Sequence, residues 1–252
     1  MKRNVTICFK LILATIIMIS FSSNAYSGDN SNDGTLYYGL TYSGLDIASI
    51  AYSESDFYPY EGIDVKNFEC KIVTFSDLLQ IGGKYRSIVG DDNSVRYYRD
   101  EHKIQDGTRV LEYWFDYNQN QIRIIDRRII GSDTTNYEKI ANINDKYSDS
   151  VSLFFRLRES LDTLTTPKYI SYFDGTDTDS LLIESISHEL FNTSGDKSTP
   201  VFVVDLRIKP GLMPGSKDKI KLYISDDENR SLIYGKMYMT LGYLELKLLS
   251  GY

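Results

Sequence analysis

The 252-residue sequence has few of the residues that most often carry out chemistry or lock a fold covalently: two cysteines, two histidines, one tryptophan and five prolines. Only Cys70 lies beyond the N-terminal segment, so no intramolecular disulfide can form there. Cys70 is expected to be a buried structural thiol, with a reactive thiol as the alternative. Neither His102 nor His188 has a second histidine three or four residues away, and both are expected at the surface or half-buried.

Signature motifs of common enzymes are also missing. The sequence contains no Gly-x-Ser-x-Gly elbow, no P-loop and no Gly-x-Gly-x-x-Gly turn. Segment 29–34 begins like a calcium loop, but Leu40 stands where the loop needs its glutamate, and 174–179 is a second acidic cluster. The sequence therefore predicts a protein that is not an enzyme, with no catalytic residues, metal ligands or cofactor.

The N-terminus carries the strongest targeting pattern in the chain. Lys2 and Arg3 precede an apolar run over 11–19, and residues 25–27 (Ala-Tyr-Ser) fit the small-x-small rule for signal-peptide cleavage. Cleavage after Ala25 is the alternative position, and an uncleaved membrane anchor is the alternative interpretation. We expect residues 1–27 to be a cleaved signal peptide, and 28–252 to form a single β-rich domain in the periplasm or outside the cell.

The net charge of the expected mature chain restricts the classes of molecule that it can bind through charge. Loss of Lys2, Arg3 and Lys10 takes the formal charge from −7 to −10, which disfavours nucleic acid as a partner. No second long apolar run follows, so no membrane span is expected after cleavage. The sequence does not indicate an oligomeric state.

Strand-like runs recur every 10–14 residues from Leu36 onward, separated by Gly, Asn and Asp clusters. Segments 201–208, 219–225 and 243–249 alternate apolar and polar residues, which is typical of strands with one buried and one wet face. This pattern favours an antiparallel sandwich, a barrel or a curled sheet.

Segments 109–116 and 121–130 flank a Tyr-Asn-Gln-Asn turn and are expected to form a hairpin. In the first of them Leu111, Tyr113 and Phe115 share one face, whereas Trp114 points the other way. A strand with large aromatic side chains on both faces is either covered on both sides or exposes an adhesive side.

One segment departs from the strand pattern. The Ser-Asp-Ser run at 148–150 can cap a helix, apolar residues follow at helical spacing, and Pro167 ends the run. The sequence predicts one helix over about 149–163, with its apolar face covering the sheet.

Four segments resemble a bacterial exported family catalogued as domain of unknown function 3108. They are DSVSLFFRLR at 149–158, LYISDDENR at 222–230, LGYLEL at 241–246 and LYYGLTYSGL at 36–45. The chain lacks the proline that follows the family's Ser-Asp-Asp turn and has Tyr223 in place of a tryptophan. The resemblance implies a half-barrel that wraps a helix, similar to the Lol-type lipoprotein carriers, and it implies no catalytic residues.

These expectations together favour a mainly β, curled antiparallel sheet that acts as a non-catalytic binding protein. Its ligand would be an apolar molecule such as a lipid, or its partner a lipoprotein or another envelope protein. The candidate lining of the concave face is apolar and comprises Phe202, Val204, Leu206, Ile208, Leu222, Ile224, Met237, Met239, Leu244 and Leu246. A closed, dry core made of the same residues is the alternative. A structural or interaction protein for envelope integrity is the second function class, and a glycan hydrolase the third.

Overall fold

The computed structural model describes residues 35–75, 82–149, 151–173, 178–192, 198–208 and 216–249. They form a single 15-stranded sheet with one helix, α2 (Ser152–Ser160). The strands are β1 (Leu36–Tyr42), β2 (Leu45–Glu54), β3 (Tyr58–Tyr60), β4 (Ile63–Thr74), β5 (Gly83–Gly90), β6 (Val95–Ile104), β7 (Gly107–Asp116), β8 (Gln121–Ile130), β9 (Asp133–Asn142), β10 (Lys168–Phe173), β11 (Thr178–Asn192), β12 (Ser198–Arg207), β13 (Ser216–Ser225), β14 (Leu232–Met239) and β15 (Tyr243–Leu248).

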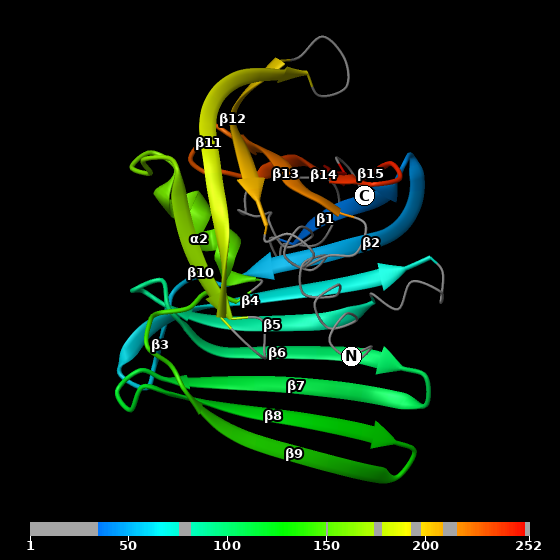
Figure 1. Cartoon of the computed structure of the whole chain (residues 1–252), viewed down its shortest axis with the longest axis vertical. Coiled ribbons are helices and arrows are strands. Elements are labelled where there is room, and N and C mark those ends of the chain that lie inside the picture. The colour runs from blue at the N-terminus through cyan, green and yellow to red at the C-terminus, as the bar shows by residue number, and fades with distance from the viewer. Residues whose placement is uncertain are drawn as a thin grey trace.

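The sheet is open and antiparallel, with the strand order β10-β11-β12-β13-β14-β15-β1-β2-β4-β5-β6-β7-β8-β9 (Figure 1). The short β3 pairs only with β4, off this path. Strand β1 lies between β15 and β2, so the two ends of the described chain meet in the middle of the sheet. Strands β9 and β10 therefore stand at its two ends.

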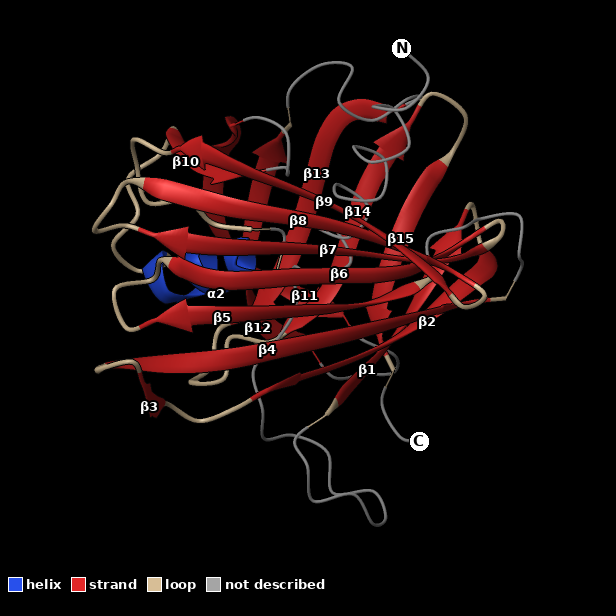
Figure 2. Cartoon of the chain, turned by 90° about the horizontal axis from the view of Figure 1, so that it is seen from below, coloured by secondary structure: helices blue, strands red, loops and turns tan. Residues whose placement is uncertain are grey.

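Curling of the sheet gives it a concave face, and α2 lies on that side between β4–β6 and β11–β13 (Figures 1 and 2). Alternate residues of each strand face inward, as the pleat requires. Tyr38, Phe68 and Phe202 are fully buried there, and Leu153 and Phe154 of α2 join the same apolar cluster. The predicted curled sheet wrapped around one helix is thus confirmed.

The helix is shorter than the predicted span 149–163. Its regular part ends at Ser160, because Leu161 donates to the carbonyl of Arg158 and Thr163 to that of Ser160, the i→i−3 bonds of a tightened last turn. At the other end residue 149 caps the first turn instead of entering it.

Three predicted strands in the C-terminal third are present as β12, β13 and β15, and the predicted central hairpin is β7–β8. One detail differs from the sequence pattern. The alternation in segment 201–208 places Val203 on the wet face, yet Val203 is buried, as is Val201. Tyr223 stands opposite Val203 and packs against Phe191, so aromatic side chains cover this part of the outer face.

The predicted signal peptide, residues 1–27, and the calcium-like segment 29–34 lie outside the described residues. The acidic cluster at 174–179 likewise has no described side chains. Among the residues that are described, no helix has the length and apolar character needed to cross a bilayer.

Candidate functional site

The ten apolar residues predicted to line a concave binding face lie on β12–β15 and directly after β12. All except Met239 are buried, and Met239 is half-buried against the same cluster, which also contains the apolar side chains of α2. These residues pack with the apolar side chains of the helix in one buried cluster. The structure brings them together as packing surface.

Asp149 holds the start of α2 against the sheet. Its carboxylate accepts hydrogen bonds from the backbone N–H groups of Val151 (2.6 Å) and Ser152 (2.9 Å) and from the hydroxyl of Ser87 on β5 (2.5 Å). The Ser152 hydroxyl accepts in return from the N–H of Asp149 (2.9 Å), a reciprocal arrangement like a capping box. Burial raises the pKa of Asp149 to about 6, although these hydrogen bonds favour its ionised form.

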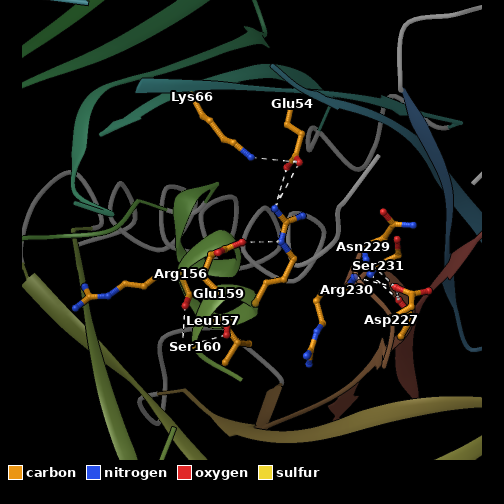
Figure 3. A network of polar contacts seen from close by, with 12 residues as sticks. Glu54, Lys66, Arg156, Leu157, Glu159, Ser160, Asp227, Asn229, Arg230 and Ser231 are labelled. Atoms are coloured by element: carbon orange, nitrogen blue, oxygen red, sulfur yellow. Dashed lines mark hydrogen bonds and ion pairs between the residues drawn. The ribbon is translucent and has the colours of Figure 1, made fainter. Parts of the chain in front are cut away.

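A buried ion cluster holds the other end of the helix (Figure 3). The Arg158 guanidinium lies 3.2 Å from a carboxylate oxygen of Glu54, the last residue of β2. Lys66 of β4 approaches the same carboxylate at 3.8 Å, and Phe155 lies beneath both cations, with centroid distances of 5.3 Å. The cluster fixes the helix to two neighbouring strands.

The turn between β13 and β14 provides a third attachment. Asp227 shapes the turn by accepting from the hydroxyl of Ser225 and from the backbone N–H groups of residues 229 and 230. Arg230 extends from this turn toward the helix side (Figure 3) and donates to both oxygens of Asp162, at 3.0 and 2.8 Å. Its guanidinium also lies 4.3 Å from the ring centroid of Phe202.

The outer face of β6–β8 carries a different kind of site. Trp114 is 40 % exposed, and its ring centroid lies 4.4 Å from that of Tyr97 on the neighbouring strand. The Tyr97 hydroxyl donates to the buried Glu112 at 2.7 Å, and burial together with this carboxylate raises the pKa of Tyr97 to about 12. The aromatic pair is therefore held in place by Glu112, whose side chain lies on the same face of the sheet.

Paired charges surround this aromatic pair. The Glu112 carboxylate forms ion pairs with the guanidinium groups of Arg127, at 2.6 Å, and Arg99, at 3.6 Å. Arg123, opposite Trp114 on β8, makes a two-pronged contact with Glu138 of β9 at 2.7 and 3.1 Å. The outer face therefore carries hydrogen-bond donors and acceptors whose charges are paired with one another, so that they nearly cancel.

We call the hollow beside Trp114 the outer groove; its volume is about 570 Å³. Its far wall is the β3–β4 turn, and its rim is the β7–β8 turn, where the Asp116 carboxylate accepts from the N–H groups of residues 118 and 119. The volume falls in the range of small-molecule sites. The lining residues are Tyr60, Glu61, Ile63, Arg96, Tyr97, Trp114, Phe115, Asp116, Tyr117, Asn118, Gln121, Arg123 and Ile140.

The histidines and Cys70 lie away from this groove. His102 is buried and its Nδ1 lies 2.9 Å from Asp100 two residues earlier on β6, which corrects the expectation of an exposed or half-buried ring. The strand alternation places both side chains on the concave face, where a carboxylate partner makes burial of the imidazole tolerable. His188 is exposed, and Cys70 is buried with its pKa raised by desolvation. Within the described ranges no three His, Cys, Asp or Glu side chains gather to hold a metal ion.

Sequence reasoning placed Trp114 on the face opposite Leu111 but did not find the groove. The lining comes from six strands and from the β3–β4 and β7–β8 turns, so it depends on a strand register that a single sequence does not reveal. The sequence signal that could have indicated the groove was Trp114, a large aromatic residue on the strand face opposite Tyr113 and Phe115.

The fold and its contacts define a class of protein: a curled, open antiparallel sheet that encloses one anchored helix. The chain matches the model of the family described as Protein of unknown function (DUF3108) over residues 70–248, and it belongs to that family. The matched range contains α2 and the β13–β14 turn, whereas the resembling segment at 36–45 precedes it.

Among solved structures the chain is similar to the beta-barrel-like protein of domain of unknown function DUF1849 from Brucella abortus. The TM-score is 0.55 at 9 % sequence identity, covering 86 % of this chain and 95 % of that one, so the likeness concerns the fold alone. None of the curated proteins compared with the chain matches it.

Proposed function

We propose that this chain is an exported, non-catalytic binding protein that recognises a glycan of the cell envelope through the outer groove. The observation that carries the proposal is Trp114, 40 % exposed at a groove of about 570 Å³ and packed on Tyr97. Large exposed aromatic side chains on a rigid sheet mark interaction surfaces.

The chemistry of the groove fits an amphipathic, hydroxyl-rich ligand. The indole supplies an apolar face for the C–H side of a sugar ring, and Asp116, Asn118 and Gln121 place acceptors and donors at the rim. Arg123 is already paired with Glu138, so the groove has no strong field of one sign that would select a highly charged ligand.

An apolar ligand within the concave face has less support. The side chains that would line that site pack with Leu153, Phe154 and Leu157 of α2 in one buried cluster. A lipid would have to displace a helix that Asp149, Arg158 and the β13–β14 turn attach to the sheet. The outer groove needs no such rearrangement.

The single tryptophan gives a direct assay, because all indole emission of the chain comes from the groove. Titration with β-1,4-linked N-acetylglucosamine oligosaccharides, and separately with soluble peptidoglycan fragments, should give a saturable change in emission. By calorimetry, Trp114→Ala should lose this binding. Tyr169→Ala removes another exposed aromatic side chain, on β10, and should retain it.

Two results would contradict the proposal. One is an emission spectrum that stays constant with both glycans up to millimolar concentration. The other is a Trp114→Ala protein that binds as tightly as the wild type. Binding only of the peptide-bearing fragments, with the bare oligosaccharides inert, would also contradict a glycan site and would favour a peptide partner.

Export is the second part of the proposal and rests on residues 1–27. The basic start, apolar run and small-x-small site support transport out of the cytoplasm followed by cleavage. Fractionation of expressing cells, with N-terminal sequencing of the recovered protein, should find a chain that begins at residue 28 or 26 outside the cytoplasm. An intact N-terminus in the cytoplasmic fraction would contradict export.

A further inference from the structure

Strand β9 ends the sheet with an unpaired edge. One side of it pairs with β8 from Asp133 to Asn142, and no described residue pairs with the other side. Its side chains are exposed on both faces, including those of Tyr137 and Ile140, except that of Ala141, which is half-buried. Figure 1 shows the strand at the far end of the sheet from β10. Such an edge is a template for another strand.

The hairpin geometry tells which backbone groups of β9 are free to pair. A two-residue turn joins Ile130 to Asp133, and at the other end the N–H of Ile143 donates to the carbonyl of Asn120. Hydrogen-bonded pairs alternate along an antiparallel ladder, so odd-numbered residues of β9 bond to β8. The N–H and C=O groups of Thr134, Asn136 and Glu138 therefore point away from the sheet.

Charge on β9 selects its partner and its register. Residues opposite each other in an antiparallel pair project from the same face, so two copies of β9 align odd with odd and even with even numbers. With the two-fold axis at Asn136, Asp133 of each copy faces Lys139 of the other. With the axis at Glu138 or at Lys139, identical charges face each other.

We propose that β9 pairs with β9 of a second copy of this chain, antiparallel, over residues 133–139 and with the two-fold axis at Asn136. Thr135 then faces Tyr137 of the second copy, and the outward backbone groups of Thr134, Asn136 and Glu138 complete their hydrogen bonds. The contact is isologous and closes as a dimer, because the β9 edge of each copy is occupied by the β9 edge of the other.

The pairing has a consequence for ligand binding. A two-fold axis perpendicular to the sheet keeps the outer faces of both copies on the same side, so the two outer grooves face one direction. Because Ile140 and the partner of Arg123, Glu138, lie on β9, each groove borders the dimer contact. Bivalent binding of a long glycan follows only if the proposed function is correct, whereas the pairing itself does not depend on it.

Sedimentation equilibrium of the purified full-length product tests the pairing by charge reversal. The wild type should be a monomer–dimer equilibrium, and Asp133→Lys or Lys139→Asp alone should weaken it by roughly tenfold or more, because two like-charge pairs replace two ion pairs. The double variant Asp133→Lys/Lys139→Asp should restore it. A wild type that stays monomeric at about 100 µM, or single variants that associate as the wild type does, would overturn the proposal.

Cysteine crosslinking tests the register separately. In Asn136→Cys the two thiols lie on the axis with Cα atoms about 5.5 Å apart, which suits a disulfide. Glu138→Cys, on the same exposed face, faces Thr134 of the second copy and should not crosslink. The native Cys70 is buried and does not interfere, and Cys8 is replaced by serine in every variant so that no other native thiol can crosslink. Equal crosslinking by both variants, or by neither, would overturn the register. If a charge variant that stays monomeric still binds glycan, the groove acts independently of the β9 pairing, so failure of one proposal does not imply failure of the other.

Discussion

Replacing Arg158 with methionine tests the inference that the buried ion cluster anchors α2. The Arg158 side chain is 5 % exposed and that of Glu54 is 9 % exposed, and the guanidinium lies 3.2 Å from the carboxylate. Methionine keeps the unbranched apolar part of the side chain over Phe155 while removing the charge, so the change isolates the electrostatic contribution.

The structure gives the expected size of the effect. Removing one partner of a buried pair typically costs about 3–5 kcal/mol, because the other charge stays buried without compensation. Lys66 remains 3.8 Å from Glu54 and offsets part of that cost, so the expected loss in unfolding free energy is near the lower end, about 3 kcal/mol. Lys66→Met should cost about 1 kcal/mol, since Lys66 is farther away and more exposed.

Urea unfolding followed by Trp114 emission measures these differences, and an unchanged m-value would show that both states keep their exposed area. The double variant Glu54→Gln/Arg158→Met should recover more than about 1 kcal/mol relative to the sum of the single changes. A loss below about 1 kcal/mol for Arg158→Met, or one equal to that of Lys66→Met, would refute the anchoring role.

The remaining predictions concern other attachment points and the thiol. Burial raises the Asp149 pKa to about 6, above its unfolded value, so the native state binds more protons between pH 4 and 6. Wild-type stability should therefore fall by up to about 3 kcal/mol as pH rises through that window, relative to Asp149→Asn measured by urea unfolding at both pH values. Arg230→Ala should cost about 1 kcal/mol and Asp162→Asn less, because the stacking on Phe202 survives the second change and Asp162 is mostly exposed. Cys70 should react with a thiol reagent more than about 100-fold faster in urea than in buffer, and equal rates would show that it is accessible in the native state.

Local periodicity was enough to predict the helix and the strands β7, β8, β12, β13 and β15. Period-two alternation places Leu222 and Ile224 on one face whatever the partner strand is, and the cap at Asp149 acts within three residues. The burial of His102 was not predicted, because its neighbours in the sequence are charged. The structure shows that Asp100, two residues earlier on the same face of β6, contacts the imidazole. Arg158 and Glu54 are 104 residues apart, and no local pattern pairs them.

The residues that resemble the family pattern serve the architecture, which explains why sequence motifs alone pointed to no chemistry. Asp149, Ser152, Phe155 and Arg158 are the capping and anchoring positions of α2, and Asp227 shapes the turn that carries Arg230. All of them act to hold a helix on the concave side of the sheet. The outer groove and the β9 edge use none of these residues, so a change of ligand or partner would leave the motif intact. A functional search in this chain should therefore begin on the outer face, at Trp114.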